Sequence, residues 1–152
     1  MSRVLITAGA AGIGYAMAQA YADAGFEVWI TDVDADALAA VPADWHAHQV
    51  DASDEASVEA LFGNIKSAGG LDVLCANAGI AGPTALVEDV ALKDWQRCVS
   101  VNLEGAFLAT KYAAPLMKSA QAGSIIYTSS TAGIYGYPNR APYSAAKWGI
   151  IG

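Results

Sequence analysis

Short apolar runs rich in β-branched residues alternate along the chain with Ala-rich stretches in which apolar positions recur at helical spacing. The pattern predicts strands at residues 4–7, 27–31, 46–50, 72–75 and 124–129. Helices are expected at residues 13–24, about 34–40 and 55–67, and helical spacing returns from about residue 91. Strands that alternate with helices in this way favour a parallel sheet with helical crossovers.

Three further features define the expected helices. Ser53 is expected to cap the helix at 55–67, although Ala56 leaves the capping box only half complete. A long apolar helix from about Leu103 to Lys118 carries few charges, so one side is expected to face the sheet and another a partner subunit. Pro142 suits the first turn of a last helix.

Composition and charge exclude several classes of protein. Of the 152 residues, 55% are hydrophobic and 15% are charged, which is too apolar for a disordered chain. The 8 basic and 15 acidic residues give a net charge of −7, so we expect no contact with nucleic acid and none with a membrane. A bound phosphate group would have to rely largely on backbone N–H groups.

Targeting segments, disulfides and metal sites are not indicated. The apolar stretches are too short to span a membrane, and the first residues lack the pattern of a secretory signal, so a soluble, cytoplasmic protein is expected. Cys75 and Cys98 have no Cys or His at ligand spacing and are expected to be core residues. His46 and His48 share one strand face without a third ligand nearby, which favours a packed or solvent-facing pair over a metal site.

A glycine-rich segment, TAGAAGIG, lies between the first expected strand and the first helix. Gly9, Gly12, Ile13 and Gly14 stand where a dinucleotide diphosphate would meet a helix N-terminus. Glycines allow the backbone to approach the anion, and free N–H groups together with the helix dipole supply the positive potential. The alternative is that these residues only make a tight turn between strand and helix.

Asp32 closes the second expected strand about 20 residues after Gly12, the spacing at which a carboxylate binds the hydroxyls of an adenosine ribose. A phosphate on the ribose 2′ oxygen would be repelled by this carboxylate. Neither Val33 nor the neighbouring alanines of the glycine loop supply a cation to receive such a phosphate. NAD is therefore favoured over NADP, and a solvated Asp at a strand end is the alternative.

Tyr143 and Lys147 are four residues apart in the last expected helix, so they share one face. A phenol is a poor acid or base at neutral pH, but a nearby ammonium favours the phenolate form. The pair is thus a usable general acid and base. Taken alone, Tyr and Lys at this spacing are more often ordinary surface residues.

Over essentially its whole length the sequence resembles the short-chain dehydrogenase/reductase family, specifically its classical branch. The order and spacing of the motifs agree as well as their identities. The residues that carry the resemblance are TAGAAGIG at 7–14, Asp32, ANAG at 76–79, VNLEG around Asn102, SIIYTSS ending at Ser130 and YSAAK at 143–147.

The resemblance implies an α/β, Rossmann-type doubly wound parallel sheet of strand order 3-2-1-4-5. It also implies a catalytic tetrad, in which Tyr143 exchanges a proton with the substrate oxygen and Ser130 hydrogen-bonds that oxygen. Lys147 would favour the Tyr143 phenolate and bind the nicotinamide ribose, and Asn102 would interrupt its helix and position a water that links Lys147 to solvent. Without the resemblance, the alternative for Ser130 is a cap at the end of a strand, and the alternative for Asn102 is a residue at the end of a helix.

The same resemblance assigns further residues to cofactor binding. Asp51 and Ala52 would lie at the adenine edge, and Asn77, Ala78 and Gly79 beneath the cofactor ribose. A turn at the entry to a helix is the alternative for Asp51.

The sequence departs from the family pattern in three places. Ala8 replaces the first loop glycine, and we expect the following Gly9 to recover some backbone freedom. Ala76 replaces the first Asn of the family's Asn-Asn-Ala-Gly motif, which removes hydrogen bonds that would tie adjacent strands. The sixth and seventh strands are missing, so residues 1–152 are expected to be one dinucleotide-binding domain, the N-terminal part of a longer one, which by itself binds NAD weakly and turns over nothing measurable.

The expected function is NAD-dependent interconversion of a small or medium secondary alcohol and its ketone. A homo-oligomer, either a dimer or a tetramer, is expected through the helix from Leu103 to Lys118.

The first alternative to this function is a non-catalytic nucleotide-binding or scaffold fragment that lacks the substrate-binding half. The second is an epimerase or dehydratase of the extended branch, which the GIG pattern disfavours. Tyr135, Tyr137 and Pro138 would form an aromatic substrate wall or serve only in packing.

Overall fold

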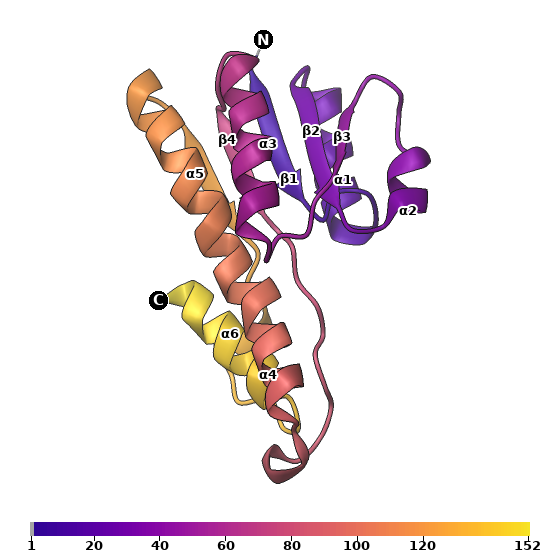
Figure 1. Ribbon diagram of the computed structural model, residues 1–152, viewed down its shortest axis with the longest axis vertical. Helices are drawn as coiled ribbons and strands as arrows, with labels where there is room; N and C mark the ends of the chain where they lie inside the picture. Colours follow the sequence, from indigo (N-terminus) through magenta and orange to yellow (C-terminus); the bar gives the residue numbers. More distant parts are fainter. Residues whose placement is uncertain (1) are drawn as a thin grey trace.

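The computed structural model describes residues 2–152 and forms a five-stranded parallel sheet with helices on both faces (Figure 1). The strand order is β3-β2-β1-β4-β5, as expected from the sequence. Of the predicted domain, only Met1 lies outside the described residues. The strands are β1 (Arg3–Thr7), β2 (Glu27–Asp32), β3 (His46–Gln49), β4 (Val73–Ala76) and β5 (Ser124–Tyr127). The α-helices are α1 (Gly12–Asp23), α2 (Ala35–Ala39), α3 (Glu55–Ser67), α4 (Leu92–Val99), α5 (Gly105–Ala120) and α6 (Ala141–Ile151).

Alternate side chains of the central strands fill two separate cores. Leu5 and Leu74 point to the face covered by α3 and α5, where they pack with Phe62. Val4 and Ile6 point to the opposite face, which α1 and α2 cover. This two-residue alternation, with both faces apolar, explains why the strands read as continuous apolar runs in the sequence.

The long apolar helix begins earlier than predicted. Instead of starting near Leu103, it begins at Leu92 with α4, passes through one π-helical turn at Ser100–Glu104 and continues as α5. In the π turn, the Asn102 Nδ2 donates to the Cys98 carbonyl oxygen at 2.9 Å, so a side chain takes part in the helical hydrogen bonding. The expected interruption near Asn102 is therefore a widened turn rather than a break. None of the helices in residues 2–152 is long and apolar enough to cross a membrane.

The predicted cap of α3 is wrong by one residue. Asp54 is the N-cap, and its carboxylate accepts hydrogen bonds from the Ser57 backbone N–H and hydroxyl. The Ser53 hydroxyl and backbone N–H donate instead to Asp51. A carboxylate at the N-cap also interacts favourably with the helix dipole, so the aspartate is the stronger cap.

The two histidines of β3 are packed against an aromatic side chain. The rings of His46 and His48 stack on Trp29, with centroid distances of 4.6 and 5.0 Å. The His46 Nε2 also lies 3.1 Å from a carboxylate oxygen of Glu27. Burial lowers the pKa of His48, and the nearby His46 acts in the same direction. Both rings thus pack on Trp29, with His48 half-buried and His46 also facing solvent.

Candidate active site

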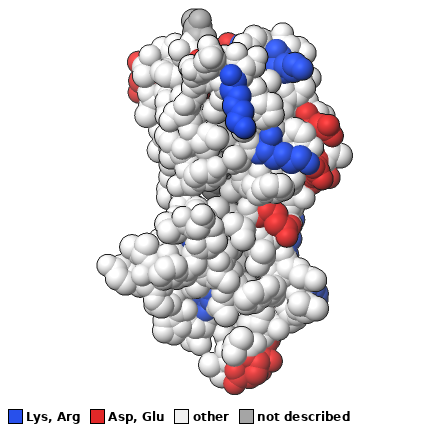
Figure 2. All heavy atoms as spheres, turned by 90° about the vertical axis from the view of Figure 1, so that its left-hand side faces the viewer, with Lys and Arg blue, Asp and Glu red and all other residues white. Residues whose placement is uncertain are grey.

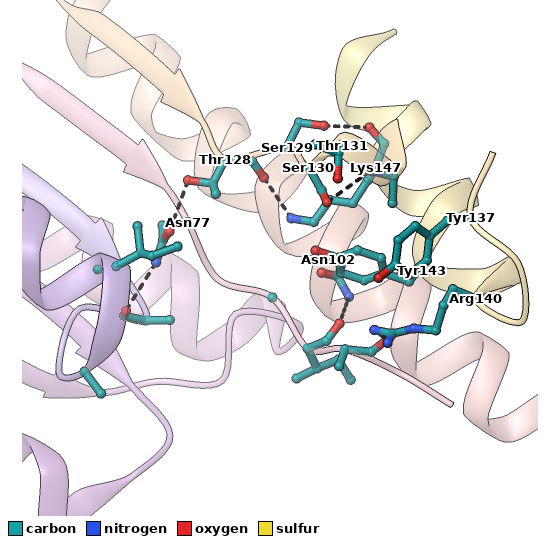
Figure 3. A pocket seen from close by; sticks show the side chains of 18 residues that line it. Asn77, Asn102, Thr128, Ser129, Ser130, Thr131, Tyr137, Arg140, Tyr143 and Lys147 are labelled. Atoms are coloured by element: carbon teal, nitrogen blue, oxygen red, sulfur yellow. Dashed lines mark hydrogen bonds between the residues drawn. The ribbon is translucent and has the colours of Figure 1, made fainter. Parts of the chain in front are cut away.

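A cleft of about 560 Å³ opens at the carboxyl ends of β1, β4 and β5. Segments far apart in the sequence meet there: the glycine loop, the residues after β4 and β5, the π turn and α6 (Figure 3). In a doubly wound sheet this is the edge at which ligands bind. The predicted site residues that line the cleft are Ile13, Gly14, Asn77, Gly79, Asn102, Ser130, Tyr143 and Lys147.

Tyr143 and Lys147 lie on the same face of α6, as their spacing predicted. The Lys147 Nζ is 5.7 Å from the centroid of the Tyr143 ring. Lys147 is only 3% exposed, and its Nζ donates to the Thr128 carbonyl oxygen at 2.8 Å. Burial lowers the pKa of this ammonium, while the nearby Cys98 acts in the opposite direction. The cleft therefore holds a phenol with a fixed, partly desolvated cation beside it.

Ser130 begins the 3₁₀ turn Thr131–Gly133 that follows β5. Its Oγ accepts a hydrogen bond from the Ala132 backbone N–H at 3.2 Å. Because a hydroxyl can accept and donate at once, this contact leaves the Ser130 O–H free to donate into the cleft. The strand-end capping role and a role toward a bound oxygen are therefore compatible.

Asn102 is 1% exposed and has one polar atom without a partner. Its Nδ2 donates to the carbonyl oxygens of Cys98 and Ile80, both at 2.9 Å, whereas its Oδ1 accepts nothing from residues 2–152. A Cβ at Gly79 would lie 2.6 Å from this Oδ1 and 3.5 Å from the Lys147 Nζ. The glycine thus keeps open the space between a buried acceptor and a buried ammonium.

The glycine loop is tightly packed around α1. A Cβ at Gly14 would lie 2.0 Å from the Ala8 carbonyl oxygen, which no side chain could tolerate. Gly12 has φ +54°, a left-handed conformation that glycine adopts without strain, whereas a Cβ at this position would touch no other atom within 4 Å. The predicted glycines of this loop therefore fix the path by which β1 enters α1.

The expectation that Gly9 compensates for Ala8 is wrong. Ala8 itself adopts the left-handed conformation, with φ 52°, whereas the φ of Gly9 is not positive. Gly9 is needed for a different reason, because a Cβ there would lie 2.6 Å from the Ile30 side chain. Ala8 thus bears the conformational strain that the missing glycine would avoid.

We expect Ala8→Gly to raise the free energy of unfolding by about 0.5–1 kcal/mol, because glycine adopts this φ without the clash of a Cβ. Urea denaturation measures the change. The matched control is Ala10→Gly in the same loop, where φ is not positive and the same exchange should destabilise the protein. A loss of stability in Ala8→Gly would contradict the assignment of strain to this residue.

Asn77 supplies the links between strands that the Ala76 substitution was expected to remove. Its backbone N–H donates to the Thr7 Oγ1 at 2.9 Å, and its Nδ2 donates to the Thr7 carbonyl oxygen at 3.1 Å. Its Oδ1 accepts from the Thr128 hydroxyl at 3.1 Å. One side chain therefore joins the ends of β1, β4 and β5 at the floor of the cleft.

Asp32 lies outside the cleft lining but next to the glycine loop. One carboxylate oxygen accepts from the Ala10 backbone N–H at 3.3 Å, and the other accepts from the Val33 N–H at 2.8 Å. The side chain therefore joins the end of β2 to the loop. The remaining predicted cofactor residues outside the lining are Gly9, Gly12, Val33, Asp51, Ala52 and Ala78.

Asp51 is already engaged by other side chains. It accepts hydrogen bonds from the Ser53 hydroxyl at 2.6 Å and from the Arg97 Nη2 at 3.0 Å. Burial opposes its charge, but these partners outweigh that effect and lower the pKa of the carboxyl. Ala52 packs against Gly105, since a Cβ there would lie 3.1 Å from the Ala52 Cβ. Both residues thus have structural partners of their own.

Two residues at the cleft escaped prediction. Thr128 anchors Lys147 through its carbonyl oxygen and Asn77 through its hydroxyl, and a backbone acceptor leaves no signature in a sequence. Arg140 lines the cleft and precedes α6, where a single arginine matches no motif.

Comparison with known proteins gives a consistent family match. A family model described as short chain dehydrogenase matches residues 2–152. The 2-dehydro-3-deoxy-L-rhamnonate dehydrogenase (NAD(+)) of Sphingomonas sp. (strain SKA58) is 36% identical over 152 residues, which cover 97% of this chain and 61% of that protein. The trans-4-hydroxycyclohexanecarboxylate dehydrogenase of Sinomonas cyclohexanicum is 39% identical, with coverage of 97% and 62%.

Solved structures give the same picture. A crystal structure of levodione reductase superposes with a TM-score of 0.92 at 32% identity, covering 99% of this chain and 62% of that one. NAD+-bound xylitol dehydrogenase superposes with a TM-score of 0.92 at 30% identity, covering 99% and 61%. The chain thus spans a little over three-fifths of the length of each of these proteins.

Proposed function

The chain belongs to the short-chain dehydrogenase family, and we propose that the protein is an NAD-dependent oxidoreductase that interconverts a secondary alcohol and a ketone. The observation that carries the proposal is the meeting of Tyr143, Ser130 and the buried Lys147 in one cleft beside the glycine loop. Two of the similar proteins are named for NAD, one as an NAD(+) dehydrogenase and one as an NAD+-bound structure.

The described residues fit a dinucleotide. Gly14 permits the loop to fold against the start of α1, where the N–H groups of the first turn have no helical partners. We assign the diphosphate to Gly12 and Ile13, the adenosine ribose to Asp32, and the adenine edge to Val33, Asp51 and Ala52. The remaining contacts, beneath the ribose of the nicotinamide half, are assigned to Asn77, Ala78 and Gly79. When bound, NAD supplies or accepts the hydride of the reaction.

Tyr143 and Ser130 act on the substrate oxygen. During reduction of a ketone, negative charge develops on this oxygen, and the Tyr143 hydroxyl gives it a proton. The Ser130 O–H, which its contact with Ala132 leaves free, donates a hydrogen bond to the same oxygen. In alcohol oxidation the Tyr143 phenolate takes the proton back.

Lys147 and Asn102 support the proton transfer. The Lys147 ammonium is held by the Thr128 carbonyl and places a fixed positive charge beside the Tyr143 ring. The unpartnered Asn102 Oδ1 and the Lys147 Nζ both border the space kept open by Gly79. A water bound by these two groups would pass protons between Lys147 and solvent, because it could accept from one and donate to the other.

The charge of Asp32 is expected to set the preference between NADH and NADPH. We expect Asp32→Asn to weaken NADH binding by about 10- to 100-fold, because the carboxylate no longer binds the ribose hydroxyls. The preference for NADH over NADPH should also become smaller, because repulsion of the 2′-phosphate is lost. Quenching of tryptophan fluorescence by each cofactor measures both dissociation constants. Asp36→Asn, which removes an exposed charge four residues away, should leave the preference as it is. An unchanged preference in Asp32→Asn would remove this residue from the ribose site.

The proposed substrates are small or medium ketones and secondary alcohols. Relatives are named for a 4-hydroxycyclohexanecarboxylate and for a rhamnonate derivative, so carboxylates belong in the trial set. The purified full-length protein should oxidise NADH, followed by its absorbance, with at least one of cyclohexanone, 4-oxocyclohexanecarboxylate, 4-oxopentanoate and the methyl esters of the two acids. Absence of turnover with all of them, in protein that binds NADH, would count against this substrate class.

We also propose that the outer side of α5 and α6 contacts a second copy of the chain. Phe107, Trp148 and Ile151 are large apolar residues that are at least half exposed on these two helices. Figure 2, which looks onto this side of the molecule, shows a broad area without charged side chains. A surface of this kind is typical of a subunit contact, and the mass of the protein in solution tests the proposal.

A further inference from the structure

The residues that line the cleft carry positive charge only. Arg140 and Lys147 are the charged residues among them, and no carboxylate of residues 2–152 contributes to the lining. This distribution is the reverse of that of the chain as a whole, whose net charge is −7. The cleft therefore suits an anionic ligand.

Arg140 lies at the end of the cleft away from the glycine loop. Its guanidinium carbon is 5.2 Å from the centroid of the Tyr143 ring and 5.8 Å from that of the Tyr137 ring. In Figure 3, Arg140 and Tyr137 lie on one side of Tyr143 and Asn77 lies far on the other. A diphosphate bound at the glycine loop is thus remote from this guanidinium, so the cofactor does not explain it.

The guanidinium has hydrogen-bonding capacity that the protein does not use. Nη2 donates to the Ala81 carbonyl oxygen at 2.7 Å, which ties the start of α6 to the loop after β4. Nε is buried and has no partner among residues 2–152. Buried donors are almost always paired, so an unpaired one in a side chain that lines a ligand cleft points to a group that arrives with the ligand.

We propose that Arg140 binds the carboxylate of a hydroxy acid or keto acid substrate whose reacting oxygen lies at Tyr143 and Ser130. Adjacent guanidinium N–H groups match the two oxygens of a carboxylate, and the unused Nε is one such group. Stacking near Tyr137 and the bond to Ala81 fix the orientation of the side chain. The inference rests on the proposed function and names the class of substrate for the same site.

The test compares each keto acid of the trial set with its methyl ester, which keeps the ketone and removes the charge. In the wild-type protein the kcat/KM for the acid is expected to exceed that for the ester. In Arg140→Met the ratio of the two values should fall about 100-fold, as expected for removal of one partner of a buried charged pair. Arg140→Lys, which keeps a charge without the planar fork, should give an intermediate ratio.

The ratio of kcat/KM for the acid to kcat/KM for the ester distinguishes carboxylate binding by Arg140 from a purely structural role. If Arg140 only ties Ala81 to α6, its replacement lowers kcat/KM for acid and ester alike, and an unchanged ratio would overturn the inference. Lys66→Met provides the control for loss of a positive charge, because Lys66 is exposed at the end of α3 and should leave the ratio at the wild-type value.

A binding measurement keeps the inference distinct from the proposed function. Ligand-observed NMR on the NADH-loaded protein compares cyclohexanecarboxylate with cyclohexanecarboxamide, neither of which can react. We expect the carboxylate to bind at least 10-fold more tightly, and we expect Arg140→Met to abolish the difference. Equal binding of the two ligands to the wild type would refute the carboxylate site even if ketones are reduced. A preference lost in Arg140→Met would support the site even if no ketone is turned over.

Discussion

Tyr143→Phe should lower kcat for ketone reduction by about 1,000-fold while leaving NADH binding within a few-fold of the wild type. The exchange removes one hydroxyl and keeps the ring that packs beside Lys147 and Arg140. A positioned general acid contributes about 10²–10⁴-fold to such reactions, and no other phenol or carboxylic acid of residues 2–152 stands at this point of the cleft. Stopped-flow measurement of a single turnover isolates the chemical step.

The matched control is Tyr137→Phe, which removes the hydroxyl of the other tyrosine that lines the cleft. Its ring lies beyond Arg140 and half of it is exposed, so its effect on kcat should be small. If Tyr137→Phe and Tyr143→Phe had equal effects, or if Tyr143→Phe retained full turnover, the proton would have to come from another group.

Lys147→Met should also reduce kcat, again by about 1,000-fold, because the variant loses the fixed positive charge that lies beside the Tyr143 ring in the cleft. Methionine is unbranched and apolar and fills the buried space that the lysine stem occupies. Single-turnover rates of the wild type and the variant test this directly, and equal rates would contradict the role of Lys147.

The same variant should be at least as stable as the wild type at neutral pH. Burial lowers the pKa of Lys147, so the unfolded chain binds its proton more tightly than the folded chain does. The resulting penalty is fully present below the lowered pKa and shrinks as the pH rises toward the ordinary value of about 10.4. The stability difference between Lys147→Met and the wild type, measured by urea denaturation, should therefore narrow as the pH increases. A variant that is unstable at neutral pH would show that the amine supports the fold instead.

Patterns that repeat at short range predicted much of the fold. The continuous apolar run of β1 identifies a strand buried on both faces, and the crossover helices impose a parallel sheet. The contact between Tyr143 and Lys147 follows from their spacing on one helix. These features depend only on neighbouring residues, so the sequence displays them directly.

Features that depend on distant contacts were not predictable in the same way. The polar and charged sequence of α4 conceals that it continues into α5 through a π turn, in which the Asn102 side chain also donates to the distant Ile80 carbonyl oxygen. The left-handed Ala8 is not expected for an alanine, and its carbonyl oxygen accepts a hydrogen bond from the distant Asn77 side chain. Arg140 reaches the cleft through a loop whose path no motif records. In each case the deciding partner lies elsewhere in the chain.

In the proposed reaction, a nicotinamide cofactor bound in this cleft exchanges a hydride with a carbonyl carbon while Tyr143 supplies the proton. NADH that carries deuterium at its transferable position, with the alcohol product analysed by mass spectrometry, tests both transfers in one experiment. We expect one deuterium per molecule on the carbinol carbon in the wild type, and a rate of labelling about 1,000-fold lower in Tyr143→Phe. Alcohol formed without deuterium, or labelled equally fast by both proteins, would contradict the proposed reaction.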